Sequence, residues 1–284
     1  LNPKIQATAA LRSLQDVGLG YLRLGQPLST LSGGEAQRLK LAEHLAGKKR
    51  HALFLLDEPT SGLHLKDVER LIGVLARLCE VGDHTVLCVE HHLDVIAAAD
   101  WVIDLGPGGG DAGGTLMFEG PPGLLAKEPS ATGKHLARWL SGVSPLRRSM
   151  VAERRDDRDA PEDGWITVSG ARTHNLKNID VRVPRTGRTV VSGVSGAGKS
   201  TLVFDIIFSE GQRRFLDCLS AYARQFIEQL AKPDADRIEG IPPTVAIEQR
   251  TTRGGSRSNV ANVTEIEPFL RILWARLGQI PGAG

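Results

Sequence analysis

One glycine-rich loop, Gly193–Ser200, has the residue types and spacing of a phosphate-binding loop. It fits the pattern G-x-x-x-x-G-K-[ST] in full, with an apolar run before it and a helical pattern after it. Its glycines let the backbone turn so that successive N–H groups face a phosphate, and the helix start adds partial positive charge. This context makes an ordinary glycine turn the weaker interpretation. The expected nucleotide contacts here are Gly193, Ser195, Gly196, Gly198, Lys199, Ser200 and Thr201. Lys199 is expected to reach the β- and γ-phosphates, and Ser200 to bind Mg²⁺.

A pair of acids, Asp57 and Glu58, follows the apolar run Leu53–Leu56. Such a run predicts a buried strand that ends at the two carboxylates. In that position Asp57 can hold Mg²⁺, and Glu58 can polarise a water for attack on the γ-phosphate. The alternative is a strand that ends in a simple turn, because Asp-Glu-Pro-Thr-Ser also suits one.

A third motif, Leu31–Arg38, places Ser32, Gly33 and Gly34 before a helix expected from about Glu35. A helix start of this kind can bind an anion, so these three residues are also expected to contact nucleotide. The alternative is a plain helix cap formed by the serine. The acid pair further along the chain favours the first interpretation.

The elements around these motifs predict an α/β protein with a largely parallel central sheet. Short continuous apolar runs, typical of strands buried on both faces, occur at 51–56, 85–89 and 101–104. Alternation at 179–183 predicts an antiparallel strand, and 115–120 a hairpin strand. A mixed-charge stretch, 141–164, predicts a solvated linker between the parts 1–140 and 165–284, with a charged surface helix as the alternative.

The composition of the 284 residues excludes some classes of protein. No apolar run is long enough to cross a bilayer, and the net charge of +2 neither supports nor opposes a nucleic-acid partner. The three cysteines, Cys79, Cys88 and Cys218, form no C-x-x-C pair, so no zinc site is expected. Few, scattered thiols fit a reducing compartment.

Together these motifs resemble those of the ABC-type ATPases. The resemblance matches Leu31–Glu35 to the signature, Asp57–His64 to Walker B and the D-loop, Glu90-His91 to the switch histidine, and Ile247–Gln249 to the Q-loop. It is closer still to the UvrA branch, the damage-sensing ATPases of bacterial nucleotide excision repair. The runs that carry it include 18–26, 94–110, 170–178 and 211–226.

The resemblance implies an ABC-type fold that uses ATP and Mg²⁺, with Glu58, His91 and Gln249 as catalytic residues. It implies damaged DNA, a second UvrA-like module or subunit and a UvrB-like protein as partners, no membrane, and a cytoplasmic location. Zinc is expected in the family, but this sequence has no ligands for it. The segment that docks the UvrB-like partner would follow about Leu277, beyond this sequence. A basic stretch at 250–258 suits phosphate contacts or a solvated loop equally well.

The order of the motifs differs from that of one ABC module. Residues 1–140 resemble the end of a second UvrA module and residues 165–280 the start of a first, as at a junction between duplicated units in a longer protein. Alternatively, residues 1–140 come from the first module of a single UvrA. The halves either close into one permuted core, the arrangement we favour, or each awaits missing strands. Two other functions stay open: a transporter-type ABC ATPase and an inert nucleotide-binding fragment.

Overall fold

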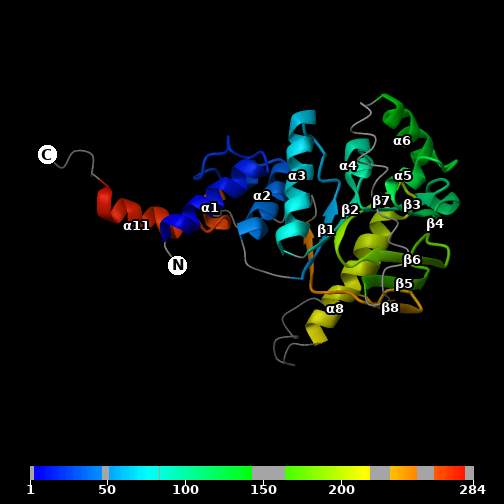
Figure 1. Ribbon diagram of the computed structural model, residues 1–284. Helices are drawn as coiled ribbons and strands as arrows, with labels where there is room; N and C mark the ends of the chain where they lie inside the picture. The colour runs from blue at the N-terminus through cyan, green and yellow to red at the C-terminus, as the bar shows by residue number, and fades with distance from the viewer. Residues whose placement is uncertain are drawn as a thin grey trace. The chain divides into compact units, whose positions relative to one another are not determined.

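The structure, a computed structural model, describes residues 3–46, 51–82, 84–142, 164–217, 231–247 and 259–278. The chain forms two compact units (Figure 1). The smaller unit comprises residues 1–49, 59–74 and 249–284, and the larger comprises residues 50–58 and 75–248. The expected linker, apart from its ends, lies outside the described residues, as do Gln249 and the basic stretch at 250–258.

A six-stranded sheet forms the centre of the larger unit, in the order β4-β3-β7-β2-β1-β9. Its strands are β1 (Leu53–Asp57), β2 (Thr85–Val89), β3 (Trp101–Gly106), β4 (Thr115–Gly120), β7 (Gly187–Gly193) and β9 (Thr244–Ile247). All neighbours pair in parallel except β3 and β4. The apolar runs in β1, β2 and β3 are buried, as expected for a sheet covered on both faces. The predicted α/β class and mostly parallel sheet are confirmed.

Strands from both sides of the charged stretch share this sheet. β7 and β9 follow it in the sequence, yet β7 lies between β3 and β2, and β9 pairs with β1. The sheet therefore has the permuted arrangement rather than two separate sets of strands. The register pairs Asp57 of β1 with Val89 of β2, and Val89 with Val191 of β7. These three residues therefore lie in one row across the sheet.

A second, antiparallel sheet lies in the same unit, in the order β6-β5-β8. Its strands are β5 (Trp165–Ala171), β6 (Ile179–Pro184) and β8 (Arg237–Glu239). Burial alternates strictly along β6, which confirms the alternation expected there. One apolar core joins residues of both sheets with the helix after the glycine loop, and Trp101 meets Trp165 edge to face with ring centroids 5.1 Å apart.

Helices complete both units. The larger unit has α4 (Leu93–Ala98), η2 (Gly110–Ala112), α5 (Pro122–Leu125), α6 (Ala131–Gly142), the π-helical segment η5 (Thr201–Phe208) and α8 (Ser209–Asp217). The smaller has α1 (Pro3–Asp16), η1 (Leu28–Thr30), α2 (Gly33–Ala46), α10 (Val260–Val263) and α11 (Glu267–Leu277), and α3 (Leu65–Gly82) crosses the division between the units. Within the described part of the chain, no helix has the length and apolar character to cross a bilayer.

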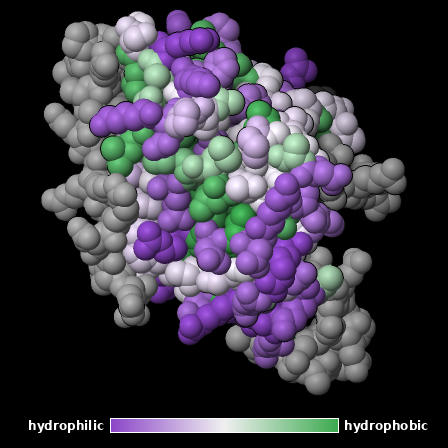
Figure 2. Space-filling model, turned by 90° about the vertical axis from the view of Figure 1, so that its right-hand side faces the viewer, coloured by the Kyte–Doolittle hydropathy of each residue, from purple (hydrophilic) through white to green (hydrophobic). Residues whose placement is uncertain are grey.

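Figure 2 shows a face on which hydrophilic side chains break the apolar surface into patches.

The smaller unit also joins distant parts of the sequence. α1 packs on α2, and α10 contacts α2 as well. Backbone N–H groups of Val260 and Ala261 donate to the carbonyls of Gln26 and Leu24 at 3.1 and 2.8 Å. The segment near residue 260 is thereby held against the turn that precedes the signature motif.

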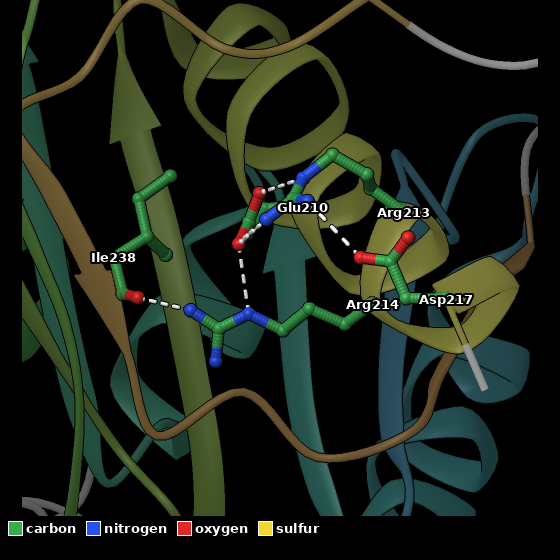
Figure 3. Close-up of polar contacts among 5 residues, drawn as sticks. All are labelled: Glu210, Arg213, Arg214, Asp217 and Ile238. Atoms are coloured by element: carbon green, nitrogen blue, oxygen red, sulfur yellow. Dashed lines mark hydrogen bonds and ion pairs between the residues drawn. The ribbon is translucent and has the colours of Figure 1, made fainter.

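A buried carboxylate anchors α8 in the larger unit (Figure 3). Glu210 is 5% exposed and accepts hydrogen bonds from Arg213 at 2.9 Å and from Arg214 at 2.7 Å. Arg214 also donates to the carbonyl of Ile238 in β8, so the cluster ties the helix to the second sheet. Burial raises the pKa of Glu210, but the hydrogen bonds from the two arginines outweigh it and leave the pKa below its ordinary value of 4.5.

We expect Glu210→Gln to lower the free energy of unfolding by about 2 kcal/mol at pH 7, because two guanidinium groups lose their charged acceptor. A depressed pKa contributes stability above the unfolded value of 4.5 that is lost as pH falls through the folded value. The difference between the proteins should therefore narrow below about pH 4.5. Urea unfolding at several pH values measures it.

Asp217→Asn is the matched control, because Asp217 pairs with Arg213 from an exposed position on the same helix. We expect it to cost less than about 0.5 kcal/mol. An equal loss in both variants, or a difference that does not change with pH, would contradict the role given to Glu210.

Candidate nucleotide site

The glycine loop begins where β7 ends. Gly193 has φ 134°, and a Cβ there would run into the carbonyl of Leu105 on the neighbouring strand. Gly198 has φ 98°, and a Cβ would lie 2.7 Å from the Leu176 side chain. Positive-φ residues among ordinary ones are typical of the backbone turns whose N–H groups bind anions. The fold of the loop therefore requires glycine at both positions, and phosphate binding by the loop stays a prediction.

Lys199 lies over this loop. Its Nζ donates to the carbonyls of Gly193 and Val194, both at 2.9 Å. Burial lowers the pKa of Lys199, while the negative charges of Glu58, Asp57 and Asp104 act to raise it. The ammonium and the acid pair thus share one electrostatic environment.

The acid pair occupies the carboxyl end of β1. β2 alone separates β1 from β7, and parallel strands end at the same edge of a sheet, where α/β proteins bind their ligands. Glu58 has φ 41°, an unfavourable backbone conformation for a residue with a Cβ, and its N–H donates to the Val89 carbonyl at 2.9 Å. The strained backbone fixes where the Glu58 side chain starts.

His91 approaches the acid pair from the end of β2. Its Nδ1 lies 3.7 Å from Glu58 Oε1, with both side chains partly exposed. The preceding residue, Glu90, is fully buried, and its carboxylate accepts the backbone N–H groups of His91 and His92 at 2.9 and 3.1 Å. Glu90 thereby fixes the backbone that presents His91 to Glu58.

Ser200 and Asp57 are the two residues predicted from the sequence to hold a magnesium ion, and this role stays a prediction. No group of three or more His, Cys, Asp or Glu side chains that could hold a metal occurs among the described residues. Mg²⁺ in nucleotide sites needs no such cage, because it takes one or two protein oxygens and completes its shell with phosphates and waters. A hydroxyl and a carboxylate are oxygen donors of the kind that Mg²⁺ takes when it binds together with a nucleotide.

The signature residues belong to the smaller unit. Ser32 and Glu35 form a reciprocal cap: the Ser32 N–H donates to Glu35 Oε2 at 2.7 Å, and the Glu35 N–H donates to Ser32 Oγ at 3.3 Å. The cap starts α2 at Gly33, two residues before the expected position. Tyr21 also donates to Glu35, and this bond contributes most to lowering the pKa of Glu35. Contact of Ser32, Gly33 and Gly34 with nucleotide stays a prediction.

The sequence pattern missed a buried polar link beside the loop. Asp104, 2% exposed in β3, accepts hydrogen bonds from Ser192 at 2.8 Å and from Thr132 at 2.7 Å. Ser192 directly precedes the loop, so this carboxylate ties two strand ends together where the loop begins. A lone acid in the apolar run 101–105 was the available signal.

The helix expected from about Lys199 is π-helical over Thr201–Phe208, a distortion common near functional sites.

Comparison with known proteins agrees with these motifs. A family model described as ABC transporter matches residues 2–61. The UvrABC system protein A of Chlamydia trachomatis is 40% identical over 270 residues, covering 94% of this chain and 15% of that protein. The protein of the same name from Mycobacterium leprae is 41% identical over 263 residues, covering 92% of this chain and 25% of that protein.

A solved structure, described as UvrA2 from Deinococcus radiodurans, is 38% identical, with a TM-score of 0.44 over 80% of this chain and 25% of that one. The chain thus spans about a quarter or less of each of these relatives. It is a stretch of UvrA-type ABC ATPase sequence that corresponds to part of those longer proteins.

Proposed function

We propose that the larger unit binds Mg²⁺ and ATP and contributes to ATP hydrolysis. The observation that carries this proposal is the order of three parallel strands, which brings the glycine loop of β7 and the acid pair of β1 to one edge of the sheet. The influence of Asp57 and Glu58 on the Lys199 pKa supports it. Parallel strands alone are common to many folds, whereas this pairing of a phosphate loop with acids is specific to nucleotide chemistry.

In this proposal each residue has a distinct task. Lys199 and the loop N–H groups bind the phosphates, and Ser200 and Asp57 hold Mg²⁺, which neutralises charge on the phosphates when bound. Glu58 orients and polarises the attacking water, and His91, 3.7 Å from Glu58, helps to position it. Gln249 and the signature residues Ser32, Gly33 and Gly34 complete such a site in the family.

We further propose that the chain is the ATPase part of a protein that recognises DNA damage in nucleotide excision repair. The matches to proteins named UvrABC system protein A support this assignment over a transporter-type ATPase. Damaged DNA, a second UvrA-like module or subunit, and a UvrB-like protein are the proposed partners, in the cytoplasm. Zinc belongs to other parts of such proteins in this proposal.

The relatives also bear on the order of the motifs. The alignments to the two proteins have similar lengths, 270 and 263 residues. They cover 15% of the chlamydial protein but 25% of the mycobacterial one, so the chlamydial protein is longer. We propose that this chain spans a junction between two UvrA-like units, with residues 1–140 from one and 165–284 from the next. Sequencing the gene beyond both ends of this stretch tests it.

We expect Glu58→Gln to bind Mg·ATP with unchanged affinity and to turn ATP over at least about a hundredfold more slowly, because the amide cannot accept a proton from water. Fluorescent-nucleotide titration measures binding, and phosphate release measures turnover. Glu80→Gln, an exposed acid on α3, is the matched control and should behave as wild type.

Three results separate the possibilities. Equal turnover in wild type and Glu58→Gln would show that another group activates the water. Binding without turnover in wild type would support an inert nucleotide-binding fragment. Failure of wild type to bind Mg·ATP would overturn the proposed site itself. Lys199→Ala, which removes the phosphate-binding ammonium, serves as the non-binding reference.

The repair assignment predicts DNA binding by the longer protein that contains this chain. Its affinity for a damaged duplex should fall steeply with salt, by a factor on the order of 10³ between 50 and 200 mM if about six phosphates are contacted. Electrophoretic mobility shifts over that range measure it. Absence of DNA affinity at low salt would favour the transporter-type alternative.

A further inference from the structure

Two segments outside the phosphate-loop motif pack against the loop within the larger unit. One is the glycine-rich stretch Gly106–Gly114, which joins β3 to β4. The other is the turn Thr173–Lys177, which follows β5. Neither segment contains a residue given a role in the proposed ATP chemistry. Together with the loop they form a three-part arrangement, called the loop brace below.

The glycine-rich stretch meets the loop backbone to backbone. The N–H groups of Gly110 and Gly114 donate to the carbonyls of Gly196 and Ala197 at 3.0 and 3.1 Å. A Cβ at Gly109 would overlap the Ser195 carbonyl, and one at Gly113 would lie 3.0 Å from the Ala197 Cα. Glycine is therefore required at these positions by close approach to the loop.

Asn175 bridges the two other parts of the brace. Its Nδ2 donates to the carbonyl of Gly196 at 2.8 Å and to that of Gly110 at 3.0 Å. The N–H of Lys177 donates to the Gly114 carbonyl at 2.8 Å, which ties the turn to the glycine-rich stretch a second time. One amide side chain thus links the phosphate loop to both supporting segments.

Asn175 contacts the carbonyl groups of the brace and not the loop N–H groups expected to bind phosphate. Both acceptors of Asn175 are carbonyl oxygens, so its side chain occupies none of the loop N–H groups that a phosphate would need. A glycine-rich loop has many accessible conformations, and only the concave one binds a phosphate. Restricting a site to its binding conformation raises affinity, because apparent affinity scales with the population of that conformation.

We propose that Asn175 is a positioning residue that keeps the glycine loop in its phosphate-binding conformation before nucleotide arrives. The expected effect of Asn175 on nucleotide affinity rests on the proposed ATP site, whereas its effect on the conformation of the loop does not require ATP. Asn175 acts through the Gly196 carbonyl and does not touch the substrate.

The test compares Asn175→Ala with Asn178→Ala in the whole chain. Asn178 lies three residues further along, has φ 53°, and accepts a hydrogen bond from Arg172 at 2.7 Å. Alanine is disfavoured at that φ, so this control destabilises the same region without removing the Asn175 bridge. Hydrogen exchange of the nucleotide-free proteins and Mg·ATP titration are measured on both, with thermal unfolding as a common reference.

We expect exchange of the hydrogen-bonded amides at the loop, those of Ala197, Gly110 and Gly114, to be about tenfold faster in Asn175→Ala, with the amides of β1 and β2 unchanged. The Kd for Mg·ATP should rise by about tenfold, as for a tenfold drop in the binding-competent population, while turnover at saturating ATP stays within about twofold of wild type. Asn178→Ala should keep wild-type loop exchange and wild-type Kd, even where its unfolding temperature is lower.

Each other outcome has a distinct meaning. Unchanged loop exchange and Kd in Asn175→Ala would overturn the proposal. Equal increases in exchange for both variants, spread over the whole unit, would show a merely structural role and overturn it too. Faster loop exchange in a protein whose wild type binds no ATP would support the brace and refute the proposed ATP site.

Discussion

The parallel pairing of β1, β2 and β7 is the constraint on which the candidate site depends. Five residue pairs join β1 to β2 and five join β2 to β7, and the register places Asp57, Val89 and Val191 in one row. With strands about 4.8 Å apart, the acid strand and the loop strand lie about 10 Å from each other at that row. A slip of one residue in either pairing would turn the side chains of that strand to the opposite face. The position of the loop relative to the acid pair is thereby set by strands that are far apart in the sequence.

Two buried carboxylates at this sheet edge, Glu90 and Asp104, are hydrogen-bonded to groups of their own unit. Glu90 binds the N–H groups of the two histidines, and Asp104 binds the hydroxyls of Ser192 and Thr132. A buried carboxylate is costly unless it is hydrogen-bonded, so both groups restrict their surroundings to arrangements that satisfy them. Glu58 and His91, the two residues proposed to act on the attacking water, are more exposed than these carboxylates.

Local patterns predicted much of this structure. The loop 193–200, the buried runs of β1 to β3 and the alternation in β6 each depend on residues close in sequence, where periodicity and turn chemistry are informative. The acid pair was expected at a strand end and lies there. Strand order depends on pairings between distant segments, so the sequence left the permuted and separate arrangements open until the sheet was known. The π-helical turn after the loop and the contacts of Asp104 and Asn175 involve such distant neighbours too, which explains why these residues had no predicted role.

A crystal structure of the chain with Mg²⁺ and a non-hydrolysable ATP analogue tests whether the glycine loop and the acid pair form one site. The measured quantity is the distance from the Asp57 carboxylate to Ser200 Oγ, together with the position of the metal. We expect one Mg²⁺ that both groups reach, directly or through a coordinated water. A separation of more than about 10 Å, too wide for one octahedral ion and its waters to bridge, would contradict it.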